Sequence, residues 1–175
     1  RNNELLSKVM SMHKHSENMN DPSHLTAVLH WYEMLRVHNW EKLRSSRGCF
    51  MTYRAGSSMI KKLFDACEKD IQERISKIFE VLEIPPLNDT MTIYKQGKMQ
   101  EIRNLLRYSY YEKDIELYSK IITQADVDTK ITTKREFAIL CCRIYCLLLL
   151  QDPPVKAVWN LQENSKHCLE HVDRK

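Results

Sequence analysis

The stretch Phe137–Leu150, which reads Phe-Ala-Ile-Leu-Cys-Cys-Arg-Ile-Tyr-Cys-Leu-Leu-Leu-Leu, decides the fold. It is apolar on every side of a helical wheel except at Arg143, and such a helix packs against neighbours all round. Its 14 residues fall short of the roughly 20 that a bilayer-spanning helix needs. We therefore predict a buried core helix at about residues 134–151 and no membrane span.

The flanks of this stretch carry helix start and stop signals. Thr133 and Glu136 stand in capping-box spacing, and Asp152-Pro153-Pro154 closes the helix. Arg143 is the polar exception, because a buried guanidinium is costly unless it is paired. We expect Arg143 either to reach the surface past the helix edge or to meet a carboxylate such as Glu136.

The rest of the chain also favours helix. Only 3 Gly and 5 Pro occur in 175 residues, which leaves little material for β-turns. No stretch alternates polar and apolar residues as a half-buried strand does. The sequence therefore predicts an all-α fold of stacked antiparallel helical hairpins around the helix at about 134–151, either as a repeat-like array or as an irregular bundle.

Apolar residues at helical spacing set the predicted elements. A short helical piece begins at Trp40, after a turn at Val37-His38-Asn39, and is interrupted at Gly48 and Gly56. Ser23, Ser57 and Asp114 are the expected N-caps, and whether 59–82 forms one helix or two stays open. The other predicted helices cover about residues 3–14, 25–35, 59–82, 91–94, 99–106, 115–122 and 155–169.

Length and composition give the class of protein. The chain has 175 residues, which fits a single all-helical domain. It begins at Arg1 rather than Met, so we expect a piece of a longer protein. Three of its six cysteines, Cys141, Cys142 and Cys146, lie within the apolar helix, where free thiols are common core residues. Reduced cysteines predict an intracellular protein, cytoplasmic or nuclear.

One segment resembles a known kind of helical hairpin. Tyr94–Leu106 reads Tyr-Lys-Gln-Gly-Lys-Met-Gln-Glu-Ile-Arg-Asn-Leu-Leu, and Leu35–Leu43 has a similar pattern. The first is similar to the middle of a pentatricopeptide or tetratricopeptide unit, in which a glycine closes one helix before the next begins. The resemblance covers about one unit, and it implies helical hairpins stacked side by side. It implies no site residues.

A basic segment between Arg36 and Lys62 is the candidate binding surface. Its cations outnumber one acid, Glu41, and aromatic residues lie between them. Cations for the backbone and aromatic faces for the bases are what a single-stranded nucleic-acid site needs. The plainer interpretation is a solvated basic edge whose aromatic side chains point inward. The segment could equally pair with the acidic residues that follow it in the chain, or bind an acidic partner. The candidate residues are Arg36, Trp40, Lys42, Arg44, Arg47, Tyr53, Arg54, Lys61 and Lys62.

The sequence predicts no catalytic, cofactor or metal site. His167, Cys168 and His171 have ligand spacing, but no second ligand pair accompanies them. Cys142 and Cys146 are one helical turn apart among leucines, a setting that raises a thiol's pKa rather than activating it. No catalytic motif occurs, so we expect a protein that is not an enzyme.

Three functions follow from these patterns. The first is a non-enzymatic helical interaction or scaffold module that binds a protein or peptide partner. The second is an RNA- or single-stranded nucleic-acid-binding helical array that uses the basic segment 36–62. The third is a secreted helical-bundle signalling protein, suggested by the length, the six cysteines and the Asn88-Asp89-Thr90 glycosylation pattern.

Overall fold

The computed structural model describes residues 22–49, 51–83, 93–112 and 115–157. Within these ranges the all-α prediction is confirmed, because no β-strand is present. None of the helices described is long and apolar enough to cross a membrane. The elements are α2 (Leu25–Met34), the π-helical turn η1 (Leu35–Asn39), α3 (Trp40–Ser45), α4 (Tyr53–Val81), α5 (Ile93–Glu112), α6 (Ile115–Gln124) and α7 (Thr132–Leu149).

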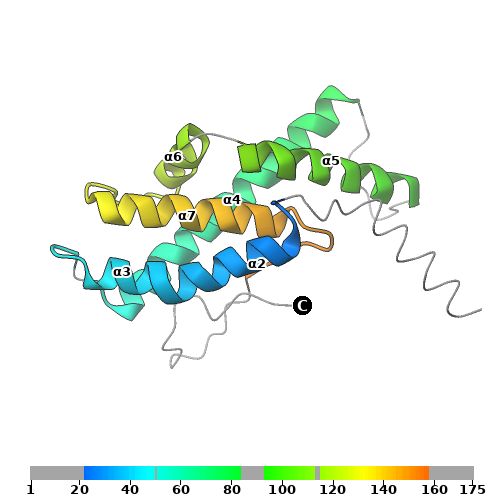
Figure 1. The fold of residues 1–175 in the computed structure, drawn as a ribbon. Helices are drawn as coiled ribbons and strands as arrows, with labels where there is room; N and C mark the ends of the chain where they lie inside the picture. The colour runs from blue at the N-terminus through cyan, green and yellow to red at the C-terminus, as the bar shows by residue number, and fades with distance from the viewer. Residues whose placement is uncertain (1–21, 50, 84–92, 113–114, 158–175) are drawn as a thin grey trace, which may run out of the picture.

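Helix α7 lies in the middle of the molecule, as the sequence predicted (Figure 1). It contacts α2, η1, α3, α4, α5 and α6, and α4 also packs against α6. The rod formed by α2, η1 and α3 runs along one side of α7, while α4 crosses behind it. Every side chain from Ile144 to Leu150 is buried. Full burial of one leucine side chain contributes about 1.5–3 kcal/mol, so this helix supplies much of the stabilising apolar contact.

The ends of α7 differ in detail from the prediction. Its N-cap is Ile131, without a side-chain cap, so the capping box predicted at Thr133 and Glu136 is wrong. The helix ends at Leu149, just before the predicted Asp152-Pro153-Pro154 stop. The described residues Val155–Ala157 are not helical, and the remainder of the predicted helix 155–169 lies outside the described residues, as does the helix predicted at 3–14.

Gln151, directly after α7, joins three segments at the end of the core. It is 4% exposed, and its Nε2 donates to the carbonyl of Ser23 at 2.9 Å and to that of Leu147 at 3.1 Å. Its Oε1 accepts from Nη1 of Arg107 in α5 at 3.3 Å. A buried amide is costly unless its donors and acceptor are satisfied, and here they are. These bonds hold Ser23, just before α2, and Arg107 of α5 against the end of α7.

Arg143 contacts a backbone carbonyl and an aromatic ring. Its Nη2 donates to the carbonyl of Tyr111 at 3.2 Å, and its guanidinium carbon lies 5.3 Å from the centre of the Tyr111 ring. Tyr111 in turn stacks on Trp31 of α2. The half-buried side chain therefore reaches the edge of α7, as expected, but its partner there is not the carboxylate of Glu136.

The rod along α7 is continuous where we predicted a turn. At Val37-His38-Asn39 the backbone stays helical and forms the π-turn η1. A π-turn inserts one extra residue into a helix. The insertion keeps Trp40 and Leu43 on the same buried side as Tyr32 and Leu35. The N-cap of α2 is His24, whose Nδ1 accepts from the Thr26 amide at 3.4 Å, so the cap predicted at Ser23 is wrong.

Helix α4 is one helix of 29 residues, which settles the open question at 59–82. It begins four residues before the predicted cap Ser57, because Thr52 is the N-cap and its Oγ1 accepts from the Ala55 amide at 3.1 Å. Gly56 therefore lies inside the helix instead of interrupting it. A Cβ at Gly56 would stand 2.1 Å from Cη2 of Trp40, so the missing side chain lets α3 and α4 approach closely.

Helix α5 also runs through a predicted break. The separate helices predicted at 91–94 and 99–106 are wrong, because α5 runs from Ile93 to Glu112 and Gly97 lies inside it. Among the described glycines only Gly48 has a positive φ. The two turns from which stacked hairpins were inferred are thus helical, whereas α6 contacts α7, the helix that follows it in the chain.

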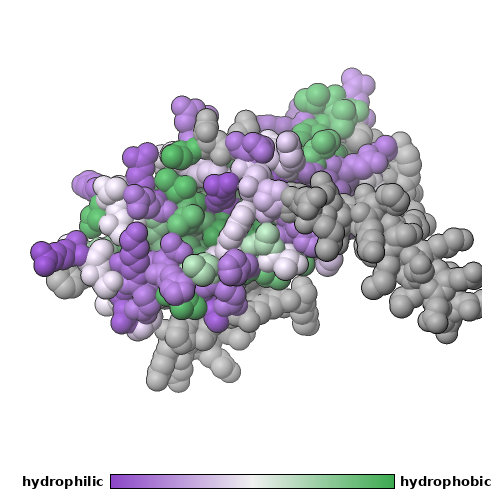
Figure 2. Space-filling model, in the orientation of Figure 1, coloured by the Kyte–Doolittle hydropathy of each residue, from purple (hydrophilic) through white to green (hydrophobic). Residues whose placement is uncertain are grey.

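The surface separates polar and apolar regions. Hydrophilic residues cover the outer side of the α2–α3 rod and the tip of the loop after α3 (Figure 2). An apolar patch lies where α4 ends, away from α7. Val81 and Leu82, at that end, are 81% and 56% exposed. The last turns of α4 therefore extend beyond the core.

The position of Leu148 in the core gives the first prediction. Leu148 is fully buried in α7, whereas Leu105 in α5 is 73% exposed. We expect Leu148→Asp to lower the free energy of unfolding by more than about 4 kcal/mol, because it buries an unpaired charge. Leu105→Asp should change it by less than about 0.5 kcal/mol. Urea titration followed by circular dichroism measures both; a folded Leu148→Asp variant would contradict the central position of α7.

The two helical glycines provide a matched pair. Gly56→Ala forces the Trp40 ring to move, and we expect it to destabilise the protein by roughly 1–3 kcal/mol. Gly97→Ala meets no atom within 4 Å and should stabilise it by about 0.5–1 kcal/mol, since alanine favours helix over glycine. Thermal melting compares the two variants with the wild type, and equal shifts would exclude the close approach of α3 and α4.

Candidate functional site

The basic segment folds around the corner between α3 and α4. Arg36 lies in η1, Lys42 and Arg44 lie in α3, and Arg47 lies in the loop that follows. Arg54, Lys61 and Lys62 lie in α4, whose first residue is Tyr53. We call the residues Lys42, Arg44, Arg47, Tyr53 and Arg54 the basic corner; each of them is exposed.

Trp40 does not belong to this surface, so its prediction as a binding residue is wrong. It is 4% exposed, and its ring centroid lies 5.8 Å from that of Phe137 in α7 and 6.2 Å from that of Tyr53. Together with the space left by Gly56, these contacts anchor α3 in the core. The inward position of Trp40 beside exposed cations agrees with the alternative to a nucleic-acid site, a solvated basic edge whose aromatic side chains point inward. Phe50 lies outside the described residues.

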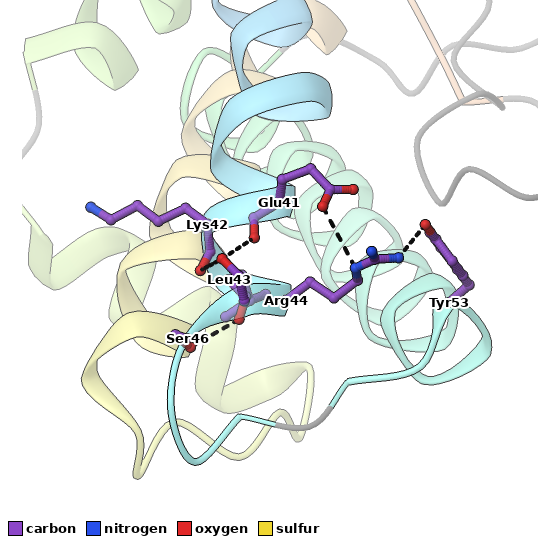
Figure 3. Close-up of polar contacts among 7 residues, drawn as sticks. Glu41, Lys42, Leu43, Arg44, Ser46 and Tyr53 are labelled. Atoms are coloured by element: carbon purple, nitrogen blue, oxygen red, sulfur yellow. Dashed lines mark hydrogen bonds and ion pairs between the residues drawn. The ribbon is translucent and has the colours of Figure 1, made fainter.

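Arg44 of the basic corner contacts two side chains, Tyr53 and Glu41 (Figure 3). Its Nη1 donates to the hydroxyl of Tyr53, and its guanidinium carbon lies 4.9 Å from the centre of that ring. Its Nε lies 3.6 Å from Oε2 of Glu41. The spacing of Glu41 and Arg44 at i and i+3 predicts their pairing. The contact with Tyr53 has no such signal, because it depends on how α4 packs against α3.

Lys42 points away from Arg44, on the other side of α3 (Figure 3). These two cations of the basic corner therefore lie on different sides of α3. Arg36 is half-buried and pairs with Glu33 at 3.1 Å, one helical turn earlier. By contrast, Lys42, Arg47, Arg54, Lys61 and Lys62 are exposed and form no ion pair with any carboxylate in the described ranges.

Two carboxylates of the acidic stretch of α4 bind side chains of neighbouring segments instead of the basic corner. Asp70 pairs with Arg74 at 3.0 Å and accepts a hydrogen bond from the hydroxyl of Tyr110 in α5 at 2.5 Å. Glu68 accepts one from the hydroxyl of Tyr145 in α7 at 2.7 Å. Burial, and secondarily the Asp70 carboxylate, raises the pKa of Tyr110 well above its usual range. These two carboxylates therefore hold α4 against α5 and α7.

The buried cysteines are packing residues. Cys67 of α4 lies against α7, with its Sγ 3.7 Å from the carbonyl oxygen of Cys142. Burial raises the pKa of the Cys67 and Cys146 thiols above the usual value. A raised pKa leaves little thiolate, and the thiolate is the nucleophile and the metal ligand. The five cysteines that the structure describes, Cys49, Cys67, Cys141, Cys142 and Cys146, are free and buried.

The metal-ligand spacing noted in the sequence cannot be placed. His167, Cys168 and His171 lie outside the described residues. In the part of the chain that is described, no cluster of histidine, cysteine and carboxylate side chains could hold a metal ion.

Comparison with known proteins adds no relative. No protein-family model matches this chain, and no curated protein and no solved structure is significantly similar to it. The resemblance of Tyr94–Leu106 to pentatricopeptide and tetratricopeptide units therefore stays a prediction.

Burial of the thiols yields a prediction that checks their role. In the native protein, the five described cysteines should not react with a charged aromatic disulfide reagent, because none is accessible. After unfolding in denaturant without reductant, all six cysteines of the chain should react. Absorbance of the released thiolate counts them. Fewer than six would indicate a disulfide and favour the secreted alternative.

Proposed function

We propose that this chain is a non-enzymatic interaction or scaffold module that binds a protein or peptide partner at the basic corner. The fold serves this role by holding α3 and the start of α4 together through Trp40 and Gly56. Trp40 and Gly56 are buried, whereas the cations of the basic corner are exposed to solvent.

One observation carries the proposal. Exposed cations with no carboxylate partner in the described ranges gather along one continuous segment, while Glu68 and Asp70 of the acidic stretch bind tyrosines of neighbouring helices. A surface with uncompensated positive charge attracts partners of opposite charge and accelerates their association. The cations are Lys42, Arg47, Arg54, Lys61 and Lys62.

The same cations support a second candidate, the binding of RNA or single-stranded DNA. Such sites combine a cationic track with aromatic faces on which bases stack. Trp40 is buried and the Tyr53 ring is covered in part by Arg44, which favours the protein partner over this alternative. Fluorescence anisotropy with a mixed-sequence oligonucleotide at about 0.05 M and 0.2 M salt tests it, because phosphate contacts weaken steeply with salt.

We also propose an intracellular location, cytoplasmic or nuclear. The five free cysteines support it, since a reducing compartment keeps thiols unpaired.

The raised pKa values of Cys67 and Cys146 support the proposal that the protein does not use these two thiols in catalysis.

The proposal predicts that charge removal at the basic corner abolishes partner binding. In the test variant, Lys42, Arg44 and Arg47 are replaced by glutamine; in the control variant, the exposed residues Lys69, Lys77 and Lys120 are replaced instead. Both variants lose three charges. Only the first should lose the proteins that crosslink to the wild-type chain in cell extract, while both keep the wild-type melting temperature.

Two results would contradict the proposal. If the test variant recovers the same proteins as the wild type, the basic corner is not the binding surface. If both variants lose them equally, only net charge matters. Mass spectrometry identifies the proteins crosslinked to the wild type and to each variant, and so distinguishes the two results.

A further inference from the structure

The side chain of Arg44 offers more than charge. Its guanidinium has two edges that can each donate two parallel hydrogen bonds to a carboxylate. Nη1 donates to the hydroxyl of Tyr53, and the guanidinium carbon lies 4.9 Å from the centre of the Tyr53 ring. Nε meets only Glu41, at 3.6 Å, and Nη2 donates no hydrogen bond within the described ranges. The edge formed by Nε and Nη2 is thus held in place and only partly used.

Glu41 is a poor occupant of this edge. A distance of 3.6 Å is beyond an ordinary charge-assisted hydrogen bond, which is about 2.7–2.9 Å long. The Arg44 and Glu41 side chains are 39% and 54% exposed, so the pair is screened by water and weak. An incoming carboxylate that meets Nε and Nη2 together would form two such bonds where Glu41 forms none.

We propose that the partner is a carboxylate-rich peptide segment, one of whose carboxylates replaces Glu41 at Arg44. This inference rests on the proposed function and names the chemistry of the partner. Tyr53 orients the guanidinium before binding, which lowers the entropy cost of forming the new pair. Lys42, on the other side of α3, and Arg47, in the loop, attract neighbouring acidic residues of the segment.

The corner suits a peptide better than a nucleic-acid strand. A strand needs a continuous cationic track with free aromatic faces. Here Lys42 and Arg44 point to opposite sides of α3, and Arg44 lies over the Tyr53 ring. A flexible acidic segment can pass around such a corner and place a carboxylate on each side.

The test measures binding of a short fluorescent poly-glutamate peptide to the full chain at about 0.05 M salt, where surface charges are least screened. Glu41→Gln removes the competing carboxylate, so we expect it to strengthen binding about two- to fivefold, the factor that matches an exposed ion pair. Glu73→Gln is the matched control, because Glu73 is exposed on α4 and unpaired in the described ranges. It should change the affinity less than Glu41→Gln does.

A second pair of variants separates geometry from charge. Arg44→Lys keeps the charge but loses the two-bond edge, and we expect it to weaken peptide binding severalfold. Arg135→Lys is its control on the exposed start of α7 and should leave binding unchanged. Each variant is first checked for a wild-type melting temperature.

Four outcomes would overturn the inference. The first is equal effects of Glu41→Gln and Glu73→Gln, which would mean that only net charge acts. The second is wild-type affinity in Arg44→Lys. The third is an oligonucleotide of equal charge that binds more tightly than the peptide. The fourth is no binding of the peptide at all. The crosslinking result at the basic corner is independent of these measurements, so it separates failure of this inference from failure of the proposed function.

Discussion

The structure depends on one constraint: a helix that is apolar all round must be covered on every side. The buried run from Ile144 to Leu150 meets it by gathering the other described helices around α7. Few of those helices pack extensively on one another, so α7 is their shared surface. The two polar residues beside this run, Arg143 and Gln151, each donate a hydrogen bond to a backbone carbonyl. Removing the helix would leave the remaining segments without a common core.

Much of this arrangement could be predicted from the sequence. The apolar composition of Phe137–Leu150 predicts the central helix, and helical spacing predicts most of α4 and α6. The misplaced boundaries arise where one local signal competes with helix propensity. Gly97 resembles a C-cap, yet its neighbours Lys98, Met99 and Gln100 favour helix and α5 continues through it. No spacing rule predicts a π-turn at Leu35–Asn39, because the turn depends on the packing of the later residues Trp40 and Leu43 on the buried side of the rod.

The candidate site was predictable in its charges and not in its contacts. The exposed cations of the segment 36–62 follow from their residue types, since lysine and arginine are rarely buried. The burial of Trp40 depends on the space above Gly56, and the Arg44–Tyr53 contact joins residues in different helices. The packing also determines which carboxylates are available to the cations of the basic corner. Tyrosines of α5 and α7 bind two carboxylates of α4, Asp70 and Glu68, so these two do not pair with the cations of the basic corner.

The late position of α7 in the chain has a consequence for synthesis on the ribosome. Residues 22–83 form α2, α3 and α4, and their apolar faces pack mainly on a helix that begins at Thr132. A nascent chain emerges from its N-terminus at about 5–20 residues per second. The first helices are therefore exposed to solvent for seconds before their partner is made. The core of this domain can therefore form only after Thr132–Leu149 has left the ribosome.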